Sequence, residues 1–184
     1  QMVAETEAIL SQSIDFLPLK TAANIVEGNA LRMDWATLQP LEENAMPTDG
    51  LFSGFTTQTD GRKHEYDYIM GNPPFVGIRH SDKSHRNDLD AVLSVIPKAG
   101  SLDYVSAWYV KAAQLIKENP HTRAAFVSTN SITQGEQAYP LWHYMFGLGL
   151  HIDFAWQTFK WTSESTEQAA VHCVIIGFSA TDGI

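Results

Sequence analysis

The segment YDYIMGNPPF, residues 66–75, joins a short apolar run to two consecutive prolines. The run Tyr66–Met70 predicts a β-strand, because aromatic and β-branched residues favour extended backbone. Two adjacent prolines can extend neither a central strand nor the interior of a helix, so the strand ends near Gly71. Pro73 also keeps Asn72 out of the helical conformation. The sequence therefore predicts a rigid loop that begins at Asn72.

Strand-like and helix-like patterns alternate on both sides of this loop. Apolar residues between Leu102 and Ile116 recur at spacings of three and four, which is typical of an amphipathic helix. No helix signal separates the last two strands, so we expect an antiparallel pair. The pattern predicts an α/β fold whose sheet is mostly parallel and closes on an antiparallel hairpin. The other strands are predicted at Ala23–Val26, Arg123–Thr129, His151–Thr158 and Ala169–Phe178, and the other helices at residues 3–13 and 137–148.

Two polar stretches are predicted to be irregular. Residues 40–64 are rich in Pro, Gly, Thr and Asp, which is typical of a connection between elements. Residues 80–91 are strongly polar and are predicted to form a solvated loop, in which Lys83 and Arg86 are candidates for contact with a nucleic-acid backbone.

Composition restricts the class of protein. The chain has 184 residues, enough for one domain with a substantial core. No apolar run is long enough to cross a bilayer, and the start lacks the features of a signal peptide. The single cysteine, Cys173, excludes an internal disulfide, and a cytoplasmic setting is expected. Because residue 1 is not methionine, we expect the chain to be a piece of a longer protein.

Charge and histidine spacing bear on possible ligands. The formal net charge is −9, whereas a stand-alone nucleic-acid binder usually carries a basic patch. If the protein acts on nucleic acid, most phosphate contacts must come from another part of it. The seven histidines are scattered without the spacing of metal ligands, so no metal site is expected.

The Asn72–Phe75 loop suits one kind of ligand. The side-chain oxygen of Asn72 and a neighbouring backbone carbonyl can point the same way, which places two acceptors opposite the two hydrogens of a planar NH2 group. A nucleobase amine and an amide NH2 are both such groups. The ring of Phe75 can stack on a flat substrate, which contributes about 1–3 kcal/mol per base. A base reaches such a pocket only after it leaves the duplex.

This motif resembles the catalytic motif of amino-group methyltransferases that use S-adenosylmethionine. Asn in its first position is similar to the adenine-N6 group. More narrowly, the chain resembles the methyltransferase portion of MmeI-like restriction–modification enzymes, from about residue 17 to residue 178. The segments that carry this resemblance are IVEGNALRMDW (25–35), STNSITQGEQ (128–137), FKW (159–161) and AAVH (169–172).

The resemblance implies a Rossmann-like class I methyltransferase sheet and a direct transfer of methyl to the N6 amine of a flipped adenine in duplex DNA. The catalytic residues it implies are Asn72, Pro73, Pro74 and Phe75. The residues it implies for the cofactor S-adenosyl-L-methionine are Asn29, Ala30 and Asn72, where Asn29 holds a place that is Asp in many members. The residues it implies for base stacking are Phe75, Phe159 and Trp161.

The sequence also departs from the family. No glycine-rich cofactor loop follows a first strand, and Gly147-Leu148-Gly149 lies after a predicted helix, the reverse of the order such a loop needs. Residues 1–184 are therefore expected to be a partial catalytic domain that also lacks the target-recognition domain. The isolated fragment is expected to be inactive.

Several alternatives remain open on the sequence alone. The acceptor can instead be RNA or a protein glutamine, or the chain can be a catalytically silent binding module. Asn29 can simply occupy a left-handed turn after Gly28, and Phe159 and Trp161 can be packing residues. His172, in an apolar strand, is predicted to lie in the interior.

Overall fold

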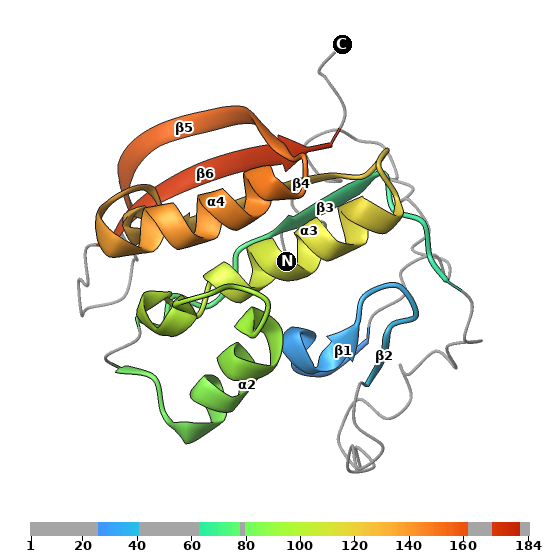
Figure 1. Ribbon diagram of the computed structural model, residues 1–184, viewed down its shortest axis with the longest axis horizontal. Coiled ribbons are helices and arrows are strands. Elements are labelled where there is room, and N and C mark those ends of the chain that lie inside the picture. The colour runs from blue at the N-terminus through green and yellow to red at the C-terminus, as the bar shows by residue number, and fades with distance from the viewer. Residues whose placement is uncertain (1–25, 41–62, 78–79, 162–170, 181–184) are drawn as a thin grey trace, which may run out of the picture. The chain divides into compact units, whose positions relative to one another are not determined.

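The computed structural model in Figure 1 describes residues 26–40, 63–77, 80–161 and 171–180. The chain divides into two compact units, and every helix and strand named below belongs to the larger one, Gly28–Ala45 with Thr59–Ile184. The helix predicted at residues 3–13 lies outside the described residues. So do most of the strand predicted at residues 23–26 and most of the irregular stretch at residues 40–64.

Four strands form the main sheet, in the order β3-β4-β6-β5. β3 and β4 are parallel, while β6 is antiparallel to both β4 and β5. The α/β class and the terminal hairpin are confirmed, but the prediction of a mostly parallel sheet is wrong for these strands. The reason is that β6 inserts between β4 and β5, so one reversed strand creates two antiparallel pairings. The bounds are β3 (Tyr68–Gly71), β4 (Arg123–Thr129), β5 (His151–Trp161) and β6 (Val171–Ser179).

Three α-helices accompany this sheet: α2 (Lys83–Leu93), α3 (Ser106–Glu118) and α4 (Ala138–Gly147). The short elements are η1 (Ala30–Arg32), η3 (Ala99–Ser101), η4 (Asn130–Thr133), η5 (Gly135–Gln137) and the small hairpin β1 (Met33–Asp34) with β2 (Gln39–Pro40). The helices predicted at residues 102–116 and 137–148 are thus confirmed within a few residues.

Helix α2 overturns the prediction of a solvated loop at residues 80–91. Its N-cap is Asp82, whose carboxylate accepts a hydrogen bond of 2.8 Å from the backbone N–H of His85. Leu89, Val92 and Leu93 are buried, and their spacing of three and four residues gives the helix one apolar face. The polar residues of the first two turns obscure this pattern when the sequence is considered alone.

The core lies between the sheet and helices α3 and α4, which run side by side over it (Figure 1). At its centre the Tyr109 ring contacts Phe126, Phe178 and Trp142, with ring centroids 5.3, 5.3 and 5.8 Å away. The hydroxyl groups of Tyr109 and Ser128 are 2.8 Å apart and hydrogen-bonded. This packing holds α3 against β4 and β6.

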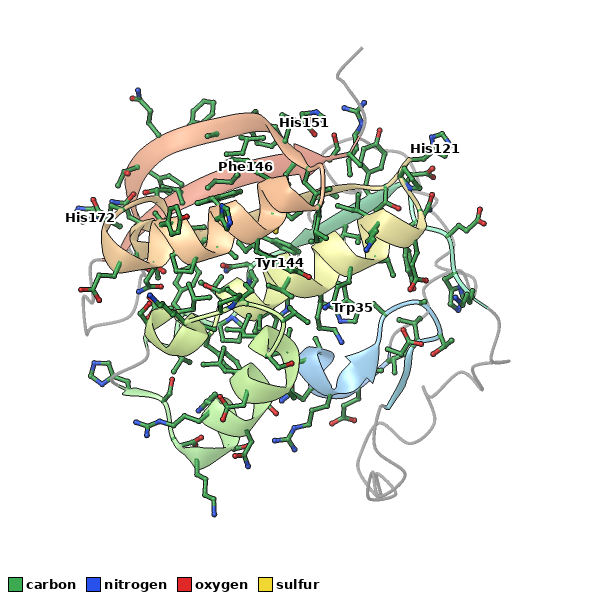
Figure 2. All side chains as sticks on the ribbon, viewed as in Figure 1. Trp35, His121, Tyr144, Phe146, His151 and His172 are labelled. Carbon is green, nitrogen blue, oxygen red and sulfur yellow. The ribbon has the colours of Figure 1, made fainter. Side chains whose placement is uncertain are left out.

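The prediction that His172 lies in the interior is wrong, because its side chain is exposed (Figure 2). The pairing of β4 with β6 ends at Thr129 and Cys173, so His172 extends beyond the neighbouring strand. Cys173 itself is buried. None of the helices in the described part of the chain has the length and apolar character needed to cross a membrane.

Candidate active site

The loop after β3 has the shape that its two prolines predict. β3 ends at Gly71, Asn72 is exposed, Pro73 is buried and Phe75 is half-buried. The backbone N–H of Val76 donates to the carbonyl of Pro74 at 3.1 Å, which closes a tight turn around Phe75. The Asn72 amide makes no hydrogen bond to any other described residue, so its polar atoms are available to a ligand.

Residues 103 and 104, just before α3, hold the loop after β3 in place. The backbone N–H of Tyr104 donates to the carbonyl of Val76 at 3.1 Å. Gly77, which follows Val76, lies close to the Asp103 side chain: a Cβ atom at residue 77 would be in van der Waals contact, 3.7 Å from one carboxylate oxygen. The other oxygen of Asp103 accepts a hydrogen bond of 2.7 Å from Ser131, which follows β4. The loops at the carboxyl ends of the two parallel strands therefore share one support, as expected where open α/β sheets bind ligands.

Both polar ends of the Asn29 side chain have hydrogen-bond partners. Its Oδ1 accepts from the backbone N–H of Leu31 at 2.9 Å and so caps η1, while its Nδ2 donates to Asp88 at 2.9 Å. The φ of Asn29 is −76°, so the alternative of a left-handed turn is wrong. Beside it, the carbonyl of Ala30 accepts from the indole N–H of Trp35 at 2.8 Å.

Asp88 of α2 is the centre of a network that the sequence did not reveal. Its carboxylate is 5% exposed and also accepts from Arg32 Nε at 2.7 Å and from the Tyr104 hydroxyl at 2.8 Å. Burial opposes its ionisation, but the hydrogen bonds from Arg32, Tyr104 and Asn29 together outweigh burial and hold the pKa of Asp88 below its usual value. Burial and the contact with Asp88 raise the pKa of Tyr104 to about 12, so that hydroxyl keeps its proton at neutral pH.

This network connects two predicted parts of the site. Asn29 contacts Asp88, Asp88 contacts Tyr104, and the backbone of Tyr104 holds Val76 behind the Asn72 loop. One signal for it exists in the sequence. Asp88 falls next to Leu89 and four residues before Val92, so a carboxylate lies on the buried face of α2 and requires polar partners.

The Asp88 carboxylate gives a physical reason for an amide at position 29. We expect Asn29→Asp to lower the free energy of unfolding by about 2 kcal/mol at pH 7. The substitution replaces the amide that donates to the Asp88 carboxylate with a second carboxylate, which repels it. Such a pair binds a proton in the folded state with a raised pKa, so the loss shrinks as the pH falls from 7 to 5. Urea unfolding at both pH values measures this effect.

Asn29→Ala is the matched control for that substitution. It also removes the cap and the donor, but it adds no charge, so its loss of stability stays constant between pH 7 and pH 5. An Asp variant as stable as the wild-type protein at pH 7 would contradict the arrangement of Asn29 and Asp88 described above.

The two predicted stacking residues of β5 lie across the sheet from the Asn72 loop. Phe159 is half-buried and pairs with Cys173, which in turn pairs with Thr129 at the carboxyl end of β4. It therefore lies at the same end of the strands as Asn72 but on the opposite edge strand, three strand positions or about 14 Å away across the sheet. Trp161 pairs with Val171 through its backbone, and its side chain lies outside the described residues. Only Phe75 is in the same loop as Asn72.

Known proteins resemble the chain over almost its whole length. The family described as MmeI, DNA-methyltransferase domain, matches residues 1–183. The chain belongs to this family. The resemblance to MmeI-like methyltransferase portions that the motifs indicate is thus confirmed.

Two similar proteins illustrate how much of a protein this MmeI-family chain represents. DNA methyltransferase A of Bacillus subtilis (strain 168) is 35% identical over 166 residues, which are 90% of this chain and 16% of that protein. A solved structure of MmeI, a type IIL restriction–modification enzyme in complex with DNA, matches 99% of this chain with 39% identity and a TM-score of 0.72. The match covers 21% of that MmeI chain, so this chain spans a small part of both relatives.

Proposed function

We propose that this chain is part of an S-adenosylmethionine-dependent enzyme that methylates the N6 amine of adenine in duplex DNA, within a restriction–modification protein. The observation that carries the proposal is the Asn72 amide, exposed and unpartnered among the described residues, on a loop fixed by a buried proline. A loop of this kind suits a flat amine because its proline-restricted backbone fixes the Pro73 carbonyl and the direction in which the Asn72 side chain leaves the chain before the substrate arrives.

In the proposed reaction Asn72 and the Pro73 carbonyl accept the two hydrogens of the adenine amine. This orients the nitrogen lone pair and increases its nucleophilicity as the amine becomes pyramidal. S-adenosylmethionine, when bound, supplies an electrophilic methyl group whose carbon–sulfur bond breaks as the carbon–nitrogen bond forms. The amine then loses one proton to water. Positioning and local electrostatics provide most of the rate, with Phe75, Phe159 and Trp161 proposed to stack on the base.

The residues present fit one side of such a cofactor. The Asn29 residue is exposed, and its amide keeps one hydrogen and one lone pair beyond those used by Asp88 and Leu31. We therefore assign Asn29, Ala30 and Asn72 to the cofactor. The order of the four strands is compatible with the central and terminal strands of a Rossmann-like sheet, of which we propose residues 1–184 to be a part.

DNA is favoured as acceptor because the matched MmeI structure is a complex with DNA. The net charge of −9 then implies that most DNA backbone contacts come from other parts of the longer protein, which we place in the cytoplasm. RNA or protein glutamine as acceptor, and a silent binding module, are the competing assignments.

Incubation of the full-length protein with S-adenosylmethionine labelled in its methyl group tests these assignments. We expect label in duplex DNA, recovered as N6-methyl-2′-deoxyadenosine after enzymatic digestion. If label entered only RNA or protein, that molecule would be the acceptor in place of DNA. If label appeared in another DNA nucleoside, that base would be the target in place of adenine. The absence of label from all three would support the silent module.

A further inference from the structure

A lysine on α3 contacts backbone carbonyls instead of a carboxylate. Lys111 is half-buried near the middle of the helix. Its ammonium is beyond ion-pair distance of every carboxylate in the described part of the chain. It donates hydrogen bonds to the carbonyls of Met33 at 2.5 Å and Leu31 at 3.4 Å, and it lies 5.6 Å from the centre of the Trp35 ring.

Burial makes this position unfavourable for a cation. It lowers the pKa of Lys111, and the negative charge of nearby Asp34 offsets that effect only in part. The Asp34 carboxylate itself accepts from the backbone N–H of Ala36 and the hydroxyl of Thr37, both at 2.9 Å. A methionine would fill similar space without the cost of burying a charge. The charge is therefore best explained by what its hydrogen bonds hold in place.

The backbone that accepts these hydrogen bonds belongs to the turn that carries Asn29. This turn, residues 29–33, consists of η1 and the residue on each side of it. Within it, the N–H of Arg32 donates to the carbonyl of Asn29 at 2.9 Å. A single turn of 3-10 helix has poorer hydrogen-bond geometry than an α-helix and defines its own shape weakly. Neighbouring side chains must therefore fix its backbone.

Side chains bind three carbonyls of this turn. Lys111 binds those of Leu31 and Met33, and the indole N–H of Trp35 donates to that of Ala30 at 2.8 Å. Figure 2 shows the Trp35 side chain near α3, in agreement with its contact with Lys111. The backbone of the turn is thus attached to α3.

Two helices fix different parts of the turn. α2 fixes the Asn29 side chain through Asp88, and α3 fixes the backbone through Lys111. Lys111 makes no hydrogen bond to Asn29 itself within the described residues. Its influence on a ligand of Asn29 therefore passes through the backbone of the turn.

We propose that Lys111 is a positioning residue for S-adenosylmethionine: from α3 it keeps the Asn29–Ala30 backbone in the arrangement that binds the cofactor. The inference rests on the proposed function, which assigns Asn29 and Ala30 to the cofactor, and it adds a residue that sets cofactor affinity from α3. Apparent affinity falls in proportion to the fraction of molecules in the competent arrangement. A less ordered turn therefore weakens cofactor binding without changing the chemical step.

Lys111→Met in the full-length protein tests this role. The turn loses both hydrogen bonds from α3, and we expect the Kd for S-adenosylmethionine to rise about tenfold, as when the competent arrangement falls to about one-tenth of the molecules. Isothermal titration calorimetry without DNA measures this Kd independently of turnover. Lys117→Met is the matched control, because Lys117 is an exposed lysine on the same helix, and its Kd should equal that of the wild-type protein.

Steady-state kinetics separates positioning from a general loss of structure. For Lys111→Met we expect the KM for S-adenosylmethionine to rise about tenfold, while kcat at saturating cofactor and the KM for DNA stay within about twofold of wild type. A damaged fold would instead lower kcat, because less protein would be active, and would leave both KM values unchanged.

Lys111→Arg is expected to keep the Kd for S-adenosylmethionine within about threefold of wild type, because arginine also offers N–H donors to the two carbonyls and can stack on Trp35. A pocket of about 150 Å³ beside Lys111, lined also by Gln114 and Glu118, has room for the larger guanidinium group. Rescue by arginine would show that the donors matter, and not only the volume of the side chain.

Trp35→Phe is a second variant that does not depend on the folding of Lys111→Met. It keeps a ring near the ammonium but removes the N–H that donates to Ala30. We expect the Kd for S-adenosylmethionine to rise about threefold, because a hydrogen bond between neutral groups contributes less than one from a charged group.

A Kd for Lys111→Met equal to that of Lys117→Met would overturn the inference, and so would equal losses in Lys111→Met and Lys111→Arg. If Lys111→Met does not fold, an unchanged Kd for Trp35→Phe overturns it. In each of these cases, transfer of label to DNA by the wild-type protein leaves the proposed function intact. If the wild-type protein neither binds S-adenosylmethionine nor transfers label, the proposed function fails, and this inference fails with it.

Discussion

Asn72→Ala is expected to lower methyl transfer to DNA at least about 10²-fold while the protein remains folded. The substitution removes one of the two acceptors proposed for the amine, and the loss of one preorganised electrostatic group commonly costs about 10²–10³ in rate. Folding should be unaffected because Asn72 is exposed and makes no hydrogen bond to another described residue. Transfer of labelled methyl to duplex DNA, together with a thermal unfolding curve, measures both expectations.

Asn87→Ala is the control for this prediction. Asn87 is an exposed asparagine on α2 that makes no side-chain hydrogen bond among the described residues, so its loss should change neither rate nor stability. Transfer by Asn72→Ala within a factor of three of the wild-type rate would exclude the amide from the reaction, whatever happened to binding.

Asp88→Asn is expected to have the largest effect on stability, about 2–3 kcal/mol at pH 7. Three donors converge on the carboxylate, and an amide offers a single oxygen to them, so at least one donor faces an NH2 group. The Arg32 side chain is 46% exposed and can turn to water, so its share of the loss is small. Urea unfolding of both proteins at pH 7 gives the difference in free energy.

The pH dependence provides an independent check on Asp88. The pKa of Asp88 is lowered in the folded protein, so the unfolded chain binds more protons as the pH falls. The stabilisation is fully present above the unfolded pKa of about 3.9 and is lost as the pH falls through the folded pKa. The difference between wild-type and Asp88→Asn should therefore shrink below about pH 4.

Asp90→Asn is the matched control, because Asp90 is an exposed carboxylate two residues away on the same helix. It should change the free energy of unfolding little at any pH. A difference for Asp88→Asn that stayed constant from pH 7 to pH 3 would show that the carboxylate charge does not stabilise the fold.

Local patterns predicted the elements whose signals lie within a few consecutive residues. The strand Arg123–Thr129 is confirmed at both ends. Its residues are alternately half-buried and buried, as expected when successive side chains of a strand point to opposite faces. The loop at Asn72 is confirmed because proline restricts the backbone wherever it occurs. The polar start of α2 was misjudged, since its apolar face becomes visible only when it packs against α3.

The sequence alone determined a strand that ends in a rigid corner with an outward-facing amide, and a family to which the whole chain belongs. Tertiary structure decided that β6 lies between β4 and β5, and that Asp88 joins Asn29 to the support behind the corner. The physical reason is the separation along the chain over which each interaction acts. Proline and side-chain periodicity act on neighbouring residues, whereas the contact between Asn29 and Asp88 spans 59 residues and exists only once the chain has folded.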